Sequence, residues 1–162
     1  MMGQVELDKI KELLKKENVD YKSIKHKRVH TAEESSKVRG IPLSQGVKSL
    51  ILVTHEKKFV LCLVTGNREV RLKDLKAILN TKDIRLADSE DVLRITGCEV
   101  GSVHPFWNLY NEKIEILMDK HVLDNETIDC SAGTFVDSIE MKCEEFIRVL
   151  KPRIEEFTIE KL

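Results

Sequence analysis

The chain has 162 residues, of which 41% are hydrophobic and 34% carry a charge, so it predicts a globular protein with its own core rather than a disordered chain. No apolar run approaches the roughly 20 residues that cross a bilayer, and the charged start "MMGQVELDKIKELLKK" contains no secretory apolar segment. We therefore expect a soluble cytoplasmic protein with a single domain over residues 1–162. The formal net charge of −1 argues against a general nucleic-acid binder, although it leaves room for a local basic patch.

The first forty residues predict a helix, a strand and a second helix. Apolar residues at helical spacing predict an amphipathic helix over residues 5–17, and the loose alternation over residues 21–30 predicts a strand. "TAEE" is a capping-box pattern, in which the Thr31 side chain bonds the amide of Glu34 and the Glu34 carboxylate reaches back. The short helix that it opens is expected to end at Gly40.

The middle of the chain predicts a hairpin of central strands, because residues 47–53 and 59–65 are apolar, β-branched runs around "HEKK". Shorter elements are expected to follow it: a turn at Gly66 and Asn67 into a strand over 68–71, a helix over 72–79, a strand over 84–87, and a helix over 89–96 capped by Asp88 and ended by Gly97.

The last third predicts three strands, over residues 114–119, 127–133 and 134–141, and a helix over residues 143–150 that stops before Pro152. The tail to residue 162 has no clear pattern. The order of elements predicts a mixed α+β domain whose sheet is largely antiparallel, has six or more strands and is flanked by helices.

Four isolated cysteines argue against a cysteine-built zinc site, because no two of them form a CxxC pair. Free thiols that are buried or half-buried are expected at Cys62, Cys98, Cys130 and Cys143. His26 and His30 are four residues apart, but a helix there is doubtful, so they do not predict a metal site. The sequence predicts no metal and no cofactor.

Residues 96–107, "TGCEVGSVHPFW", form an unusual stretch that concentrates two of the seven glycines and one of the three prolines. Glycine permits dihedral angles and close backbone approach that a Cβ forbids, and Pro105 fixes its own φ. A rigid loop with exposed amides can hold a carbonyl or an oxyanion. On this loop alone, an ordinary tight connection is the favoured interpretation, because most clusters of glycine and proline are turns.

Several segments occur in an order that resembles the YbaK/prolyl-tRNA editing-domain family of aminoacyl-tRNA deacylases. The resemblance covers roughly residues 20–150, and its most specific parts are the lysine after "QGV" and the "GxxxP" loop. The segments are "VHTAEE" (29–34), "QGVKSLIL" (45–52), "TGNREVRLKDLK" (65–76), "RLADSEDVLRITGCEVGSVHPF" (85–106), "ILMD" (116–119) and "SAG" (131–133).

The resemblance implies a trans-acting domain with a compact mixed α+β fold, which hydrolyses the ester of mischarged tRNA. It implies that a lysine on the central strand and the GxxxP loop form the site. Carried onto this chain, these are Lys48 and the loop residues Gly101, Ser102, Val103, His104 and Pro105. Many relatives have a second proline where this chain has His104, so this position bears on the shape of the loop and on the preferred amino acid.

An aminoacyl ester is already activated, so its hydrolysis needs positioning and oxyanion stabilisation more than a strong nucleophile. Amides around Gly101 to Val103 are expected to hold the aminoacyl carbonyl, and Lys48 to place a positive charge near the terminal adenosine phosphate. The resemblance also implies that the ribose hydroxyl of the substrate activates the attacking water. No GxSxG elbow occurs, and no Ser-His-Asp triad is required.

Other residues have two interpretations each. His104 is either a general base at the pocket rim, since its ordinary pKa lies near neutrality, or a loop side chain in solvent. Thr31 is first a helix cap, and His30 is a candidate for the pocket lining. The resemblance also places four residues near the pocket, which without it would be a strand-end carboxylate and a turn: Asp119, Ser131, Ala132 and Gly133.

A cluster of basic residues in "YKSIKHKR" is the best candidate for contacting tRNA phosphates: Lys22, Lys25, Lys27 and Arg28. A solvated strand face is an equally open interpretation, and no aromatic side chains interleave to suggest base stacking. The expected partner is a mischarged aminoacyl-tRNA, with an aminoacyl-tRNA synthetase as a further possibility and no membrane or DNA partner.

Two other function classes stay open on the sequence. One is a non-catalytic module of the same fold that binds tRNA or a synthetase, which the presence of Lys48 and the GxxxP loop argues against. The other is a metal-dependent hydrolase of small esters that uses the histidines. The sequence does not identify the amino acid removed, the tRNA or the oligomeric state.

Overall fold

The computed structural model describes residues 3–161, which form five α-helices, three short 3-10 helices and ten strands. The α-helices are α1 (Gln4–Lys16), α2 (Ala32–Arg39), α3 (Leu72–Ile78), α4 (Ser89–Thr96) and α5 (Cys143–Leu150). The 3-10 helices are η1 (Leu43–Gln45), η2 (Trp107–Leu109) and η3 (Lys120–Asp124). The strands are β1 (Tyr21–Lys25), β2 (Gly46–Thr54), β3 (Phe59–Thr65), β4 (Arg68–Val70), β5 (Ile84–Leu86), β6 (Glu115–Asp119), β7 (Thr127–Ser131), β8 (Asp137–Lys142), β9 (Arg153–Glu155) and β10 (Thr158–Glu160).

One sheet contains eight of these strands, in the order β1-β8-β7-β2-β3-β6-β9, with β5 beside β2. The pairs β1–β8, β7–β8, β2–β3 and β2–β5 are antiparallel, whereas β2–β7, β3–β6 and β6–β9 are parallel. β4 and β10 form a separate antiparallel ribbon. The predicted α+β class with a mixed sheet is confirmed, and the hairpin expected from residues 47–53 and 59–65 is the pair β2–β3 at its centre.

The central strands are buried on both faces, and β3 shows why its sequence is apolar throughout. Successive side chains of a strand point to opposite faces. Leu61 and Leu63 accordingly pack in the larger core cluster, which also contains residues of α1, α4 and α5. Val60, Cys62 and Val64 pack in the smaller cluster, which contains residues of α3. Each such buried side chain contributes about 1.5–3 kcal/mol through removal from water.

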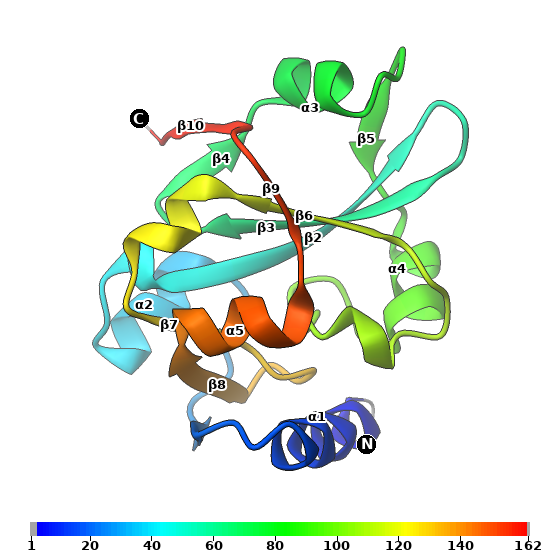
Figure 1. The fold of residues 1–162 in the computed structure, drawn as a ribbon. Coiled ribbons are helices and arrows are strands. Elements are labelled where there is room, and N and C mark those ends of the chain that lie inside the picture. Colours follow the sequence, from blue (N-terminus) through cyan, green and yellow to red (C-terminus); the bar gives the residue numbers. More distant parts are fainter. Residues whose placement is uncertain (1–2, 162) are drawn as a thin grey trace.

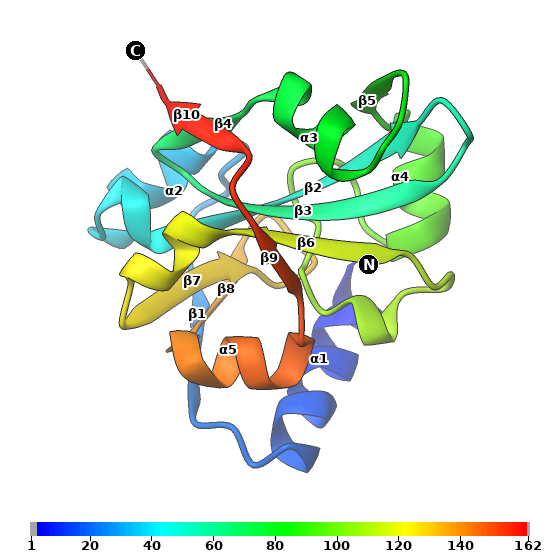
Figure 2. The ribbon, with the colours of Figure 1, turned by 45° about the horizontal axis from the view of Figure 1, so that its top comes forward.

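Helices cover both faces of the sheet. In Figure 1, α3 and the β4–β10 ribbon lie on one side of β2 and β3, and α1 and α5 lie on the other. Figure 2 shows the same layers from a view turned by 45°, with α3 above the central strands and α5 below them. Within residues 3–161 no helix is long and apolar enough to cross a membrane. The expected free cysteines are confirmed, and all four are buried.

Local capping signals predicted several element boundaries. The Thr31 hydroxyl accepts a hydrogen bond from the amide of Glu34 at 3.1 Å, so the predicted N-cap of α2 is confirmed. Gly40 and Gly97 end α2 and α4 with φ values of 67° and 77°, in the left-handed region that glycine adopts at low cost. Asp88 occupies the N-cap of α4 but makes no side-chain cap bond, because its carboxylate pairs with Arg85 at 3.2 Å instead.

Two predicted strands are shorter than expected, and the tail contains two that were not predicted. Two strands were expected, over residues 127–133 and 134–141, but β7 ends at Ser131 and β8 begins only at Asp137. A turn separates them, in which the Thr134 hydroxyl donates to the Asp137 carboxylate and Gly133 has a φ of 93°. Near the C-terminus, β9 extends the main sheet and β10 pairs with β4.

Candidate functional site

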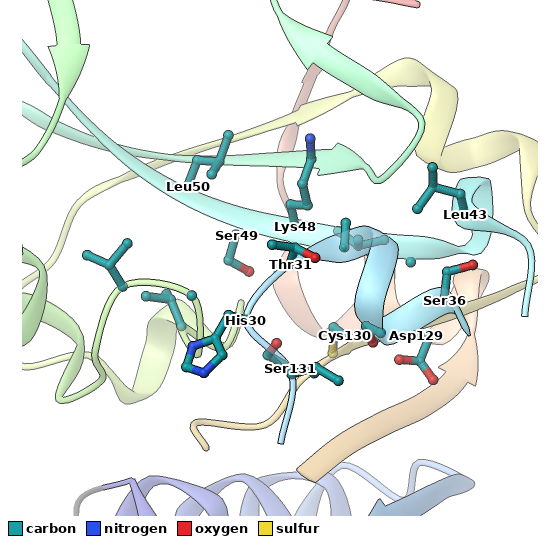
Figure 3. Close-up of a pocket in the computed structure, with 18 of the residues that line it drawn as sticks. His30, Thr31, Ser36, Leu43, Lys48, Ser49, Leu50, Asp129, Cys130 and Ser131 are labelled. Carbon is teal, nitrogen blue, oxygen red and sulfur yellow. The ribbon is translucent and has the colours of Figure 1, made fainter. Parts of the chain in front are cut away.

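A cavity of about 320 Å³ lies where the main sheet is interrupted. β2 pairs with β7 only at Gly46 and Val47 and with β5 only from Leu52 to Thr54, so among the described strands none covers residues 48–51 on that side. α2, the loop after α4 and the end of β7 close around this gap (Figure 3). The volume is at the lower end of the range for small-molecule sites.

The lining combines an apolar wall with polar groups that can orient a ligand. The apolar residues are Val29, Ala32, Ile41, Pro42, Leu43, Val47, Leu50, Ile51, Leu86, Ala87, Val92, Val100 and Val103. The others are His30, Thr31, Ser35, Ser36, Gly46, Lys48, Ser49, Gly101, Asp129, Cys130 and Ser131. Of the predicted site residues, the structure thus brings six together at the cavity: His30, Thr31, Lys48, Gly101, Val103 and Ser131.

Lys48 begins the uncovered part of β2, and its ammonium donates to the main-chain carbonyl of Arg68 on β4 at 2.8 Å. In Figure 3 its Nζ points away from His30 and Ser131. Burial lowers the pKa of Lys48 to about 8, and the nearby ammonium of Lys161 lowers it further. Lys48 is therefore a cation at the cavity up to about pH 8.

The loop after α4 brings Gly101 and Val103 to the cavity. Gly101 has a φ of 95°, and a Cβ there would lie 3.2 Å from Cε1 of Phe135 and 3.5 Å from the carbonyl oxygen of His30. The position therefore needs glycine both for its backbone conformation and for its close packing. The Ser102 amide donates to Glu99, whereas among residues 3–161 no hydrogen-bond partner is found for the amides of Gly101 and Val103.

The polar floor is built from β7 and α2. The Asp129 carboxylate forms an ion pair with Arg39, and Arg39 also lies 3.5 Å from Glu140. Burial raises the pKa of Asp129, and the Arg39 guanidinium opposes that rise. The hydroxyl of Ser49 on β2 is buried and has no hydrogen-bond partner among the described residues. A buried hydroxyl without a partner is available to bond a ligand or water.

His30 stands at the edge of the cavity in contact with two other side chains. Its Nε2 accepts a hydrogen bond from Nε of Arg28 at 3.3 Å, and its ring centroid lies 4.8 Å from that of Phe135. The guanidinium of Arg28 lies over the same Phe135 ring at 4.5 Å. Arg28 therefore lies beside the cavity residue His30 and also contacts the Phe135 ring.

His104 is not at the pocket rim, which corrects both interpretations of the sequence. Its side chain is fully buried, and its Nδ1 accepts a hydrogen bond from the amide of Phe106. Rings of Phe106 and Tyr110 pack beside it. Burial lowers the pKa of His104 to about 3, so the imidazole is neutral near pH 7 and is enclosed in the core.

Ser102 and Pro105 are also buried and do not line the cavity. The Ser102 hydroxyl donates to the carbonyl of Glu99 at 2.9 Å, so it closes a turn instead of facing a substrate. The Pro105 carbonyl accepts a bond from the amide of Trp107. Both residues shape the loop from behind, and the expectation that they reach the pocket is wrong.

Three residues that the resemblance placed near the pocket lie elsewhere. Asp119 is fully buried, and its carboxylate accepts hydrogen bonds from the amides of His121 and Phe157. Ala132 is fully buried outside the cavity lining. Gly133 packs against Gly3, whose carbonyl oxygen would lie 3.3 Å from a Cβ on Gly133. These positions join elements together and do not contact the cavity.

The basic residues of 22–28 do not form a uniform patch. All four side chains are exposed, but Lys25 lies 3.4 Å from the Asp137 carboxylate, which offsets its charge. Lys22 belongs to the opposite face of the edge strand β1 from Lys25, because the two positions differ by an odd number. Arg28 contacts the cavity residue His30.

Sequence reasoning missed Ser49, Asp129 and Arg39. The alternation of "TIDCSAG" places Asp129 on the same strand face as Ser131, which is a signal that the pattern contained. No signal in a single sequence pairs Arg39 with Asp129, because ninety positions separate them.

Residues 26–149 match the family model described as "Aminoacyl-tRNA editing domain". The chain is 25% identical over 159 residues to the multifunctional Ser/Thr-tRNA deacylase ProXp-y of Escherichia coli (strain K12), covering 96% of this chain and 94% of that protein. It is 36% identical over 93 residues to the proline–tRNA ligase of Aquifex aeolicus (strain VF5), which is 56% of this chain and 16% of the ligase.

Solved structures share the fold. The crystal structure of hypothetical protein APE2540 superposes with a TM-score of 0.84 and 20% sequence identity, covering 93% of this chain and 99% of that chain. A candidate trans-editing enzyme for prolyl tRNA synthetase superposes with a TM-score of 0.82 and 20% identity, covering 95% of this chain and 97% of that chain.

Proposed function

Because the chain belongs to the aminoacyl-tRNA editing-domain family, and so to a class of aminoacyl-tRNA hydrolases, we propose that it acts in trans and removes the amino acid from mischarged tRNA at the cavity beside β2. The observation that carries this proposal is that Lys48, Gly101 and Val103 line one cavity, and that within residues 3–161 the amides of Gly101 and Val103 have no hydrogen-bond partner. A cytoplasmic location and association with a synthetase stay predictions.

In this proposal the loop holds the aminoacyl carbonyl. The amides of Gly101 and Val103 donate to the carbonyl oxygen, and these bonds strengthen as negative charge develops on that oxygen in the transition state. Ser102 takes no part, since its amide and its hydroxyl are both bonded to Glu99. The close packing of Gly101 on Phe135 fixes the loop before the substrate binds.

The reaction is a hydrolysis in which water supplies both the oxygen and the proton. The water oxygen forms a bond to the carbonyl carbon, and the resulting tetrahedral oxyanion collapses with cleavage of the bond between that carbon and the ribose oxygen. The ribose oxygen takes a proton, so the products are a free amino acid and a tRNA with an intact terminal hydroxyl. We assign the activation of water to the neighbouring ribose hydroxyl of the substrate.

Lys48 is proposed to bind the terminal nucleotide. Its ammonium is partly desolvated and bonded to one main-chain carbonyl, so it retains donors for a phosphate or ribose oxygen. A cation held at the cavity edge positions the ester relative to the loop amides, and the positioning supplies much of the rate. This is the role expected for Lys48 from its charge and its place on the strand.

The cavity favours a small aminoacyl group with a polar side chain. Its volume of about 320 Å³ must also accommodate part of the ribose, and the unpaired Ser49 hydroxyl gives it one buried polar group. The Escherichia coli relative is a Ser/Thr-tRNA deacylase. We therefore propose serine or threonine as the amino acid that this chain removes.

A panel of tRNAs charged with serine, threonine, alanine and valine tests this proposal, with release of the amino acid as the measurement and spontaneous hydrolysis subtracted. Serine or threonine should be released fastest, and Lys48→Ala should slow release about tenfold or more, because a hydrogen bond to a charged group contributes about 1.5–3 kcal/mol. Binding of tRNA without release from any charged tRNA would instead support the non-catalytic module.

A further inference from the structure

The C-terminal segment, residues 150–161, lies outside the residues that match the family model, and its strand β10 lies near Lys48. Phe157 is fully buried, its amide donates to the Asp119 carboxylate, and its carbonyl accepts from the amide of Arg71. Arg68 on β4 donates from its side chain to the hydroxyl and the carbonyl of Thr158 on β10. These bonds fix β10 along β4, whose Arg68 carbonyl binds Lys48.

This pairing brings a second lysine to the place where the Lys48 ammonium is bound. Lys48 donates to the carbonyl of Arg68, and the amide of Lys161, which follows β10, donates to the carbonyl of the adjacent Asn67 at 3.2 Å. The two ammonium groups lie close enough for that of Lys161 to contribute to lowering the pKa of Lys48. Two cations therefore lie near each other, one on β2 at the cavity residue Lys48 and one at Lys161 after β10.

Two exposed carboxylates oppose the charge of this pair in the free protein, since Glu33 and Glu69 both act to raise the pKa of Lys48. Lys161 forms an ion pair with Glu33 at 2.8 Å, but the Glu33 side chain is 57% exposed. Glu33 is in the first turn of α2, just after the cavity residue Thr31. Like charges placed side by side repel, and an anion that contacts both removes that repulsion. A phosphate group has the charge and the several acceptor oxygens that two ammonium groups require.

We propose that Lys161 is a positioning residue for the 3′ end of tRNA: with Lys48 it holds one phosphate group at the cavity edge, and Glu33 occupies Lys161 until that phosphate binds. The inference rests on the proposed function, because the ligand is a phosphate of the tRNA substrate. It adds a residue from the C-terminal strand to a site that otherwise comes from β2, α2, β7 and the loop after α4.

The two members of the ion pair give predictions of opposite sign. Lys161→Ala removes one phosphate contact and should weaken the binding of uncharged tRNA about tenfold, the lower end for a charged hydrogen bond because the side chain is partly exposed. Glu33→Gln removes the competing carboxylate and should tighten binding. Lys161→Arg should restore binding, since it keeps a cation that binds phosphate.

The experiment measures equilibrium binding of uncharged tRNA at several salt concentrations, together with single-turnover deacylation. Lys161→Ala should lower the slope of log affinity against log salt by about 0.7, the value for one phosphate of a single strand. The rate at saturating enzyme should fall less than it does in Lys48→Ala, since Lys48 still binds the phosphate when Lys161 is removed. Lys11→Ala is the matched control, because Lys11 is an exposed lysine on α1, on the other side of the sheet from β10.

Equal affinity and equal salt slope for Lys161→Ala and Lys11→Ala would overturn the inference, and so would a Glu33→Gln variant that binds tRNA more weakly than wild type. The binding measurement uses uncharged tRNA, so it does not depend on ester hydrolysis. Failure of the proposed function appears as a wild-type protein that releases no amino acid, whereas failure of this inference appears in the affinities of the Lys161 and Glu33 variants.

Discussion

Replacement of Gly101 by alanine should disable the cavity loop while leaving the protein folded. The φ of 95° is a conformation that L side chains rarely adopt, and such backbone strain costs about 1–3 kcal/mol. The added methyl carbon would also lie 3.2 Å from the Phe135 ring, closer than ordinary contact, and 3.5 Å from the carbonyl oxygen of His30. The loop can relieve both by rotating, and rotation moves the amides of Gly101 and Val103 away from the carbonyl that they are proposed to bind.

Loss of one oxyanion donor costs about 10²–10³ in rate. A displaced loop keeps part of each bond, so we expect Gly101→Ala to slow single-turnover deacylation by about 10–100-fold. Gly40→Ala is the matched control: its φ of 67° imposes similar strain, but a Cβ there has no neighbour within 4 Å and Gly40 does not line the cavity. It should lower the melting temperature and leave the rate near wild type.

Ser102→Ala separates a backbone mechanism from a side-chain nucleophile. The Ser102 hydroxyl bonds only Glu99, whose carbonyl also accepts the Ser102 amide, so its removal should cost about 0.5–1.5 kcal/mol of stability and little rate. An inactive Ser102→Ala beside a nearly normal Gly101→Ala would refute the reasoning. The same single-turnover assay on a seryl- or threonyl-tRNA measures all three variants.

Three further predictions concern charge. Because the pKa of Lys48 is about 8, its charge and the affinity for aminoacyl-tRNA should fall as pH rises through about 8, and Lys48→Arg should abolish this fall because a guanidinium stays charged. Burial keeps His104 neutral, with a pKa of about 3. The free energy of unfolding should therefore decrease as pH falls below the unfolded pKa of about 6.5, by at most about 1.4 kcal/mol per pH unit. His104→Ala should flatten this dependence in denaturant titrations and should leave any rise of the deacylation rate near pH 6.5 in place. Arg28→Ala should weaken tRNA binding and lower the salt slope by about 0.7, whereas Lys25→Ala should change neither appreciably, because Asp137 already offsets Lys25.

Local sequence signals predicted most of the helices and strands, because nearby residues determine where these elements begin and end. The bond from the Glu34 amide to Thr31 spans three residues. Gly40 and Gly97 end their helices in left-handed conformations, which glycine adopts more readily than other residues. The apolar runs of β2 and β3 needed only their own composition to identify them. The parallel pairing of β2 with β7 was not predictable in the same way, since it joins segments more than eighty positions apart.

The candidate site was predicted only in part, because contacts between distant segments decide which loop residues face the cavity. Motif resemblance identified Lys48 and Gly101, which do line the cavity, but it did not distinguish loop residues that face the cavity from residues that face the core. His104 is enclosed by Phe106 and Tyr110, and nothing in the alternation of the loop indicates that burial. The position of Lys161 near Lys48 was also not predictable from the sequence, because it depends on the pairing of β10 with β4.

The titratable side chains that line the cavity favour a base supplied by the substrate. Lys48 is an ammonium near neutral pH, and burial raises the pKa of the Cys130 thiol well above its ordinary range. Asp129 is paired with Arg39. His30 has its Nε2 lone pair occupied by the Nε–H of Arg28, so its Nδ1 carries the proton when the ring is neutral and has no lone pair for water. In the proposed mechanism a ribose hydroxyl beside the ester therefore orients the attacking water, and the protein contributes the loop amides and the Lys48 cation. A substrate with deoxyadenosine at its 3′ end should accordingly bind with normal affinity and react slowly. Normal turnover of that substrate would contradict this mechanism and would make His30 the candidate base.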